Sequence, residues 1–218
     1  MNWQWFVAPG SALYLGPLAI LAGAAVLYRE RARKAVMGWW SAIAFACGMT
    51  AASKISFYGW GTGIRAWDLT CFSGHAVISM AVWPVVGMLA APTSRPGLRA
   101  IGTVSGLVLA GLIGYSRIPL GAHPPSEVIA GTLLGGLVGT AGCLLLRHYR
   151  LPGTLLPAVG LVLLATMTIP RGAAPVLPSE RWFAAIGTAL SGREAPVSRK
   201  KWRNADGITI SHHVHLRP

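Results

Sequence analysis

The stretch LRAIGTVSGLVLAGLIGYSRIPLGAHPPSEVIAGTLLGGLVGTAGCLLL, residues 98–146, contains two long apolar runs joined by a short polar segment. The runs cover about residues 98–115 and 126–146, and beyond Arg99 and Glu127 near their starts they contain no charged side chain. A helix rises about 1.5 Å per residue, so a run of about 16 to 20 residues is about 24–30 Å long and spans most of a bilayer core. The stretch therefore predicts two membrane-spanning helices connected by a short loop.

Four further apolar runs, at about residues 12–28, 36–53, 74–91 and 155–169, have the same character. Of the 218 residues, 53% are hydrophobic and 11% are charged, whereas about a quarter of the residues of a soluble domain are charged. These patterns predict an all-α fold, a polytopic membrane helix bundle of about six transmembrane helices in residues 1–170. Residues 171–218 are expected to form a short basic C-terminal tail outside the membrane. Within it we expect an amphipathic helix at 179–191, capped by Ser179, and a possible hairpin at about 204–216.

The formal net charge is +13, and most of the basic residues lie at the ends of apolar runs or in the tail. This placement favours membrane lipids with anionic headgroups as partners and argues against nucleic acid. The loops after the first, third and fifth runs contain eight basic residues: Arg29, Arg31, Arg33, Lys34, Arg95, Arg99, Arg147 and Arg150. Those after the second and fourth contain Lys54, Arg65 and Arg117. The positive-inside rule therefore predicts that the second set faces outward.

The segment Phe72-Ser73-Gly74-His75 stands where a loop becomes an apolar helix. Ser73 is a good N-cap, and the free N–H groups of a first helical turn attract anions. Gly74 would let an anion approach the backbone, and His75 would point its imidazole toward it. A plain helix cap with a histidine at the membrane interface is the alternative.

The segment from Ser116 to Glu127 joins two apolar runs and contains His123-Pro124-Pro125. Prolines suit the first turn of a helix, so we expect His123 at the N-cap and Glu127 in the first turn. A carboxylate four residues from a histidine can fix the imidazole tautomer and leave the other ring nitrogen free to act as a nucleophile. A purely structural Glu–His pair is the alternative.

Lys54, Arg65 and Arg117 are predicted on the same membrane face as these two histidines. Three cations and a helix N-terminus can hold the three non-bridging oxygens of a phosphoryl group. No metal cluster is expected from the cysteines, which have no paired spacing: Cys47, Cys71 and Cys143. A short histidine-rich end is a weak candidate for metal binding: His212, His213 and His215.

The order Lys54…Arg65, Ser73-Gly74-His75, then Ser116-Arg117 with five residues before His123 and an acid at Glu127, resembles the three-part signature of the type 2 phosphatidic acid phosphatase superfamily. Lipid phosphatases, polyprenyl-diphosphate phosphatases, glucose-6-phosphatase and vanadium haloperoxidases belong to it. The resemblance covers residues 54–127. The sequence departs from the family pattern in four ways. Glu127 replaces the usual Asp, the Lys54–Arg65 interval is longer than usual, and Ala66 and Phe72 stand where Pro is common.

The resemblance implies a role for each matching residue. His123 would be the nucleophile and form a phosphohistidine, Glu127 would orient it, and His75 would protonate the leaving oxygen and then activate water. The phosphate would be bound by Lys54, Arg65, Ser73, the backbone at Gly74, and Arg117. Neither a metal nor another cofactor is implied.

The function implied is hydrolysis of a lipid phosphomonoester or diphosphate at the outer, periplasmic face of a bacterial inner membrane. A phosphotransferase that passes the phosphoryl group to another lipid would use the same residues. A non-catalytic lipid-binding protein on the same scaffold is a further alternative. The sequence leaves the identity of the lipid and the oligomeric state open.

Overall fold

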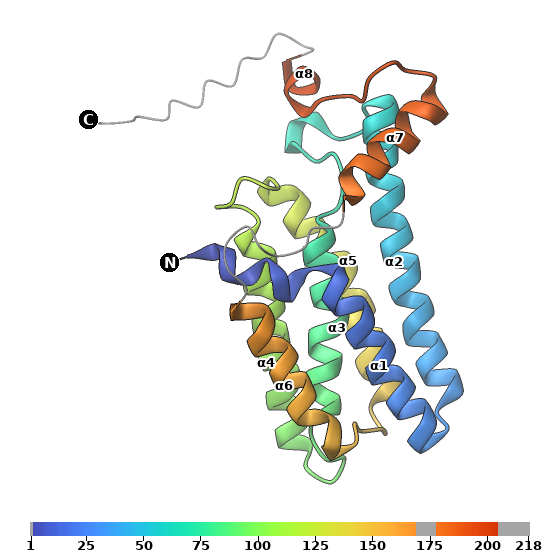
Figure 1. Cartoon of the computed structure of the whole chain (residues 1–218), viewed down its shortest axis with the longest axis vertical. Coiled ribbons are helices and arrows are strands. Elements are labelled where there is room, and N and C mark those ends of the chain that lie inside the picture. The colour runs from blue at the N-terminus through green and yellow to red at the C-terminus, as the bar shows by residue number, and fades with distance from the viewer. Residues whose placement is uncertain (1, 169–177, 205–218) are drawn as a thin grey trace, which may run out of the picture.

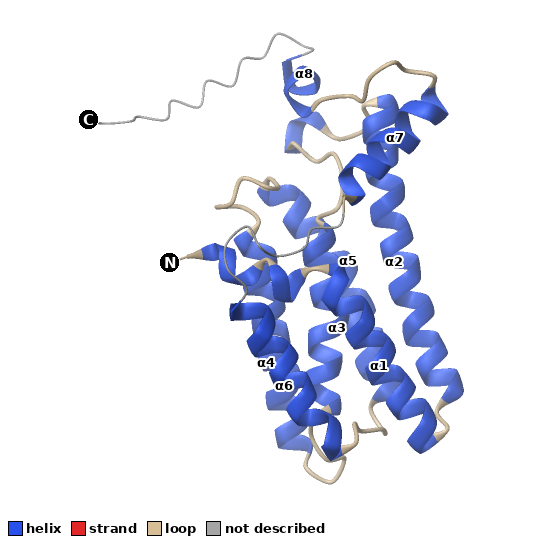
Figure 2. Ribbon diagram, viewed as in Figure 1, coloured by secondary structure: helices blue, strands red, loops and turns tan. Residues whose placement is uncertain are grey.

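The computed structural model describes residues 2–168 and 178–204, which form helices and their connecting loops (Figures 1 and 2). Six apolar helices follow one another along the chain: α1 (Ala12–Glu30), α2 (Arg33–Trp60), α3 (Gly74–Leu89), α4 (Pro96–Ser116), α5 (Pro125–Leu146) and α6 (Leu156–Thr168). Two polar helices come after them, α7 (Ser179–Ser191) and α8 (Arg199–Asn204). Short 3-10 turns occupy Trp3–Phe6, Ala8–Gly10, Arg65–Trp67 and Gly153–Leu155. The described residues contain no strand, so the all-α prediction is confirmed.

Helices α1, α2, α4 and α5 are each long and apolar enough to cross a membrane, while α3 and α6 have 16 and 13 residues. Figure 1 shows α1 to α6 running in roughly the same direction along the bundle, with α7 and α8 gathered at one end. Large apolar side chains of α4 and α5 point outward, among them Val104, Val108, Leu133 and Leu137. Such an apolar exterior suits contact with lipid, which confirms the predicted polytopic membrane bundle.

Helix α3 is the centre of the bundle, and nearly all of its residues are buried. It packs against α4 and α5 through glycines that bring the backbones into contact. Gly87 of α3 faces Gly102 of α4, and a Cβ on either one would overlap the other's carbonyl. On α5, Gly135 and Gly139 lie against the carbonyls of residues 77 and 80 in the same way. Small residues of this kind allow close packing where no hydrophobic force drives helices together, so these contacts fix the relative height of the helices.

Arg99 was predicted to be a charged loop residue, but it lies in the first turn of α4 and is buried. Its guanidinium donates hydrogen bonds to the carbonyls of Ala91 at 3.1 Å, Tyr149 at 3.0 Å and Arg147 at 3.0 Å. Arg99 therefore supplies hydrogen bonds to buried carbonyls in the segments that directly follow α3 and α5, and so ties the ends of these two helices to α4.

The second apolar run was expected to end near residue 53, but α2 continues through Trp60. The helix ends where Gly61 adopts the left-handed conformation with φ 69°, which glycine enters without steric cost. The extra turns of α2 pack against α7, because Gly59 and Gly187 let the two backbones meet. The helix predicted at 179–191 is confirmed as α7, although its N-cap is Pro178 and Ser179 is its first residue. The hairpin predicted near 204–216 and the three C-terminal histidines lie outside the described residues.

Two adjacent glycines of α5 give a matched test of this packing. Gly135→Ala should destabilise the protein by about 1–3 kcal/mol, because the new methyl group meets the carbonyl of Val77. Gly136→Ala should be neutral or stabilise the protein by up to about 1 kcal/mol, since no atom lies within 4 Å of its Cβ position. Thermal unfolding in detergent micelles measures both, and equal melting temperatures for the two variants would contradict the packing described.

Candidate active site

Three helix ends meet beside α2 at the end of the bundle that carries α7 and α8: the last turn of α4 and the first turns of α3 and α5 (Figure 1). A backbone hydrogen bond from the Ser73 N–H to the Glu127 carbonyl, 3.1 Å long, joins the starts of α3 and α5. Gly131 permits this approach, because its Cβ would lie 2.8 Å from the Ser73 carbonyl oxygen. The two segments singled out in the sequence are therefore adjacent in space.

His123 is presented by the loop between α4 and α5. The Arg117 carbonyl accepts hydrogen bonds from the N–H groups of Ala122 at 3.0 Å and His123 at 3.2 Å, which closes the loop on itself. Helix α5 begins at Pro125. The prediction that His123 is the N-cap is wrong, because Pro124 takes that position. The reason is that Pro124 is extended, with ψ 160°, while Pro125 takes the first helical position, where a missing N–H costs nothing.

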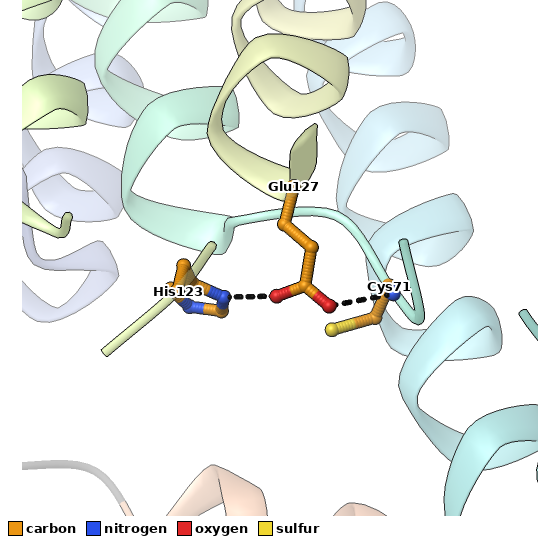
Figure 3. Close-up of side chains that lie close together, drawn as sticks. All are labelled: Cys71, His123 and Glu127. Atoms are coloured by element: carbon orange, nitrogen blue, oxygen red, sulfur yellow. Dashed lines mark hydrogen bonds and ion pairs between the residues drawn. The ribbon is translucent and has the colours of Figure 1, made fainter. Parts of the chain in front are cut away.

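The predicted pair of His123 and Glu127 is formed. The two side chains approach to 2.6 Å between Nδ1 of His123 and Oε2 of Glu127, and Figure 3 shows the two groups facing each other. Glu127 is 0% exposed. Because Nδ1 is held by the carboxylate, Nε2 of His123 is the nitrogen left for chemistry.

The second oxygen of Glu127, Oε1, is held by residues that the sequence did not single out. It accepts hydrogen bonds from the backbone N–H groups of Thr70 at 3.1 Å and Cys71 at 3.2 Å, and from the Thr70 hydroxyl. Arg199 of α8 donates a further bond at 2.7 Å. These donors compensate for the burial of the carboxylate, which would be costly without them. No local pattern marks Thr70, and Arg199 lies 72 residues farther along the chain.

Four side chains near this pair have buried polar atoms that lack a hydrogen-bond partner among the described residues: Ser73 Oγ, His75 Nε2, Arg117 Nε and Arg199 Nη1. Ser73 is the N-cap of α3, as predicted, but its hydroxyl makes no capping bond. The ring of His75 is hydrogen-bonded to the backbone of Val7, which leaves Nε2 as its free nitrogen. Native proteins seldom leave such groups unpaired. This cluster is therefore suited to hold a ligand that accepts hydrogen bonds.

Lys54 lies in α2 and is 6% exposed, with its ammonium group paired to the Glu180 carboxylate of α7. Tyr58 donates a hydrogen bond of 2.8 Å to the other Glu180 oxygen. Burial raises the pKa of Glu180, but the Lys54 charge and the two hydrogen bonds outweigh it and lower the pKa. The Glu180 carboxylate also lies near enough to Arg117 and His123 for its charge to act on both. The Glu180 carboxylate therefore lies beside Lys54 and near Arg117, two basic side chains of the cluster.

Arg65 is placed differently from the other predicted phosphate ligands. It lies on the exposed 3-10 turn, and its guanidinium stands over the indole of Trp202 at 5.6 Å from the ring centroid. Gly74 is the first residue of α3, next to Ser73, as predicted. The structure thus sets Arg65 against α8 and brings the other seven predicted residues together. These seven are Lys54, Ser73, Gly74, His75, Arg117, His123 and Glu127.

Cys71 lies beside the pair, and its sulfur is within 4.8 Å of the nearest ligand atoms of His123 and Glu127. Burial and the neighbouring Glu127 carboxylate raise the pKa of the Cys71 thiol to about 11. A thiol with such a pKa is a poor nucleophile at neutral pH. The three groups could surround a metal ion, but both oxygens of Glu127 already accept hydrogen bonds that the metal would have to displace.

Comparison with known proteins agrees with this geometry. Residues 60–151 match the family model of the PAP2 superfamily. A Klebsiella pneumoniae protein described as "Uncharacterized 22.5 kDa protein in cps region" is 32% identical over 203 residues, which cover 91% of this chain and 96% of that protein. The chain belongs to the PAP2 superfamily. No solved structure matches it. Membership in the PAP2 superfamily confirms the resemblance found in the sequence and points to phosphatase or phosphotransferase chemistry.

Proposed function

We propose that this PAP2 protein is a lipid phosphatase that works through a phosphohistidine at His123. The observation that carries the proposal is the contact of 2.6 Å between His123 Nδ1 and the buried Glu127 carboxylate. A buried carboxylate on one ring nitrogen stabilises positive charge on the imidazole and directs the lone pair of the other nitrogen outward. That is the arrangement that nucleophilic catalysis by histidine requires.

In the first step, Nε2 of His123 attacks phosphorus and the bond from phosphorus to the leaving oxygen breaks. Protonated His75 gives the leaving oxygen its proton through Nε2. In the second step, neutral His75 takes a proton from water, the hydroxide attacks phosphorus, and the phosphorus–nitrogen bond breaks to release inorganic phosphate. Lys54, Arg117, Ser73 and the N–H groups at the start of α3 bind the non-bridging oxygens, whose charge grows in the transition state. No residue in this scheme requires a metal ion.

The substrate proposed is a phosphomonoester or diphosphate of a lipid. Its apolar chains would remain beside the lipid-facing helices, while the headgroup enters the end of the bundle where the histidines lie. In a bacterial inner membrane, this site would face the periplasm, because basic residues gather in the loops at the opposite end of the bundle.

His123→Ala should lower phosphate release by about a thousandfold or more, because the nucleophile is lost. Cys71→Ala is the matched control from the same cluster, and it should keep activity within a few-fold because the thiol stays protonated. Purified protein is assayed with phosphatidic acid, phosphatidylglycerophosphate, a polyprenyl diphosphate, a sphingolipid phosphate and lipid A, each with and without a chelator.

Full activity of the folded His123→Ala protein would overturn the mechanism. Transfer of labelled phosphate to a second lipid, with none released, would identify a phosphotransferase that uses the same intermediate. Wild-type protein that binds these lipids but turns none of them over would indicate a binding protein.

Glu180→Gln tests the acidic side chain that faces Lys54. An entering phosphate must displace Glu180 from Lys54, so loss of its charge should lower KM by about two- to tenfold. Glu194→Gln, at an exposed position of the same C-terminal segment, is the control and should leave KM unchanged. Because Lys54 and the two hydrogen bonds lower the pKa of Glu180 in spite of its burial, the carboxylate stays charged at neutral pH. A higher KM for Glu180→Gln would show that Glu180 assists binding and does not compete with it.

A further inference from the structure

Arg199 contacts Glu127, yet neither the sequence motifs nor the family match contains it. It lies on α8, 72 residues beyond Glu127, while the PAP2 match ends at residue 151. Its NH2 group donates to Glu127 Oε1 at 2.7 Å and to the Thr70 hydroxyl at 2.9 Å. A short polar helix near the C-terminal end of the chain thus reaches the carboxylate behind the proposed nucleophile.

The contacts around α8 fix its position on the loop that precedes α3. Trp202 is buried, donates a hydrogen bond of 2.7 Å to the Gly61 carbonyl, and packs edge-on against Phe57. Arg203 forms an ion pair with Asp68, and the Val197 N–H donates to the Tyr58 carbonyl at 2.9 Å. Arg199 therefore extends from a helix that several other contacts hold in place, and these contacts position it beside Glu127.

We propose that Arg199 is a positioning residue of the catalytic centre, which holds Glu127 so that its other oxygen orients His123. This inference rests on the proposed function. The buried carboxylate has two oxygens: one faces the guanidinium of Arg199 and the hydroxyl of Thr70, and the other faces the imidazole. With Oε1 held, rotation of the carboxyl group is restricted and Oε2 stays aligned with Nδ1. Partners of this kind behind a reacting group commonly change activity by about 10–100-fold when removed.

Arg199 also balances charge. The groups that face the Glu127 carboxylate are His123 from the loop before α5, Thr70 and Cys71 from the loop before α3, and Arg199 from α8. Without the guanidinium, the negative charge of Glu127 would lose the positive charge from α8 that offsets it, and Glu180 adds a second negative charge near His123. A positive charge on the imidazole of His123 would then be favoured. The nucleophile must be unprotonated at Nε2, so activity would then be lost at a higher pH on the acid side of the profile.

The test compares three full-length variants in detergent micelles or vesicles. Arg199→Gln removes the charge, and Arg199→Lys keeps the charge but replaces the planar guanidinium that contacts Glu127 and Thr70 through Nη2. Lys200→Gln removes one positive charge from the exposed side of the same helix. For each variant, kcat, KM and the pH dependence of kcat/KM are measured with the lipid phosphate that the wild-type protein hydrolyses best. Size-exclusion chromatography and thermal unfolding report whether the variant folds.

Arg199→Gln should lower kcat by about 10–100-fold with KM changed less than about threefold, and should move the acid limb of the profile upward by about half a unit to one unit. Arg199→Lys should keep the acid limb of the wild type and show an intermediate kcat, and Lys200→Gln should match the wild type. A folded Arg199→Gln protein with wild-type kcat, or with a loss confined to KM, would overturn the proposal.

If Arg199→Gln does not fold, Arg199→Lys decides the matter, because the flexible lysine side chain lacks the rigid planar guanidinium whose single Nη2 group holds both Glu127 and Thr70. A threefold or larger loss of kcat supports the proposal, and an unchanged kcat overturns it. Absence of phosphate release from the wild-type protein would instead refute the proposed function, so the two failures are distinct.

Discussion

Glu127 is an ionisable side chain buried in a helix start near the membrane surface, and the end of the bundle is built around it. A carboxylate in such a place needs compensating partners, and the structure supplies them from three parts of the chain: the loop before α3, the loop before α5, and α8. Each partner has a second consequence. The hydrogen bond to His123 selects the free nitrogen, and the bonds to the loop before α3 bring Ser73 and His75 to the same place. The need of the buried Glu127 carboxylate for partners thus brings the loops before α3 and α5 and helix α8 together at the site.

The glycine contacts of α3, α4 and α5 fix the positions of these helices along one another, and so make this assembly possible. Helices in lipid gain little from burying apolar surface against each other, so their relative positions depend on close backbone packing. Gly131 brings α5 against the first turn of α3, and Gly102 brings α4 against the far end of α3. A displacement of α5 by one residue along α3 would move His123 and Glu127 away from Ser73 at the start of α3. The precision of the site therefore comes from the bundle and not from the loops alone.

The sequence predicted those parts that depend on local patterns. Apolar run length predicted six helices, and the residue types at helix ends predicted Ser73 at the start of α3 and the contact between His123 and Glu127. Features that arise from tertiary contacts were missed. Helix α2 continues to Trp60 because α7 packs against it, and Pro124 replaces His123 at the N-cap because Pro125 suits the first helical position. Arg199 and Thr70 carry no signal in a single sequence, since a basic tail and a loop threonine usually face solvent. The pairing of Lys54 with Glu180 likewise depends on how α7 docks.

The most direct test of this account is to find where the phosphoryl group resides during turnover. Protein incubated with its lipid substrate is quenched in alkali, digested, and examined by mass spectrometry, and the modified peptide is assigned by phosphorus NMR. The account predicts one phosphoryl group on Nε2 of His123, because Nδ1 is held by Glu127 at 2.6 Å. A phosphoryl group on Cys71 or on His75, or steady phosphate release with His123 unmodified throughout, would contradict it.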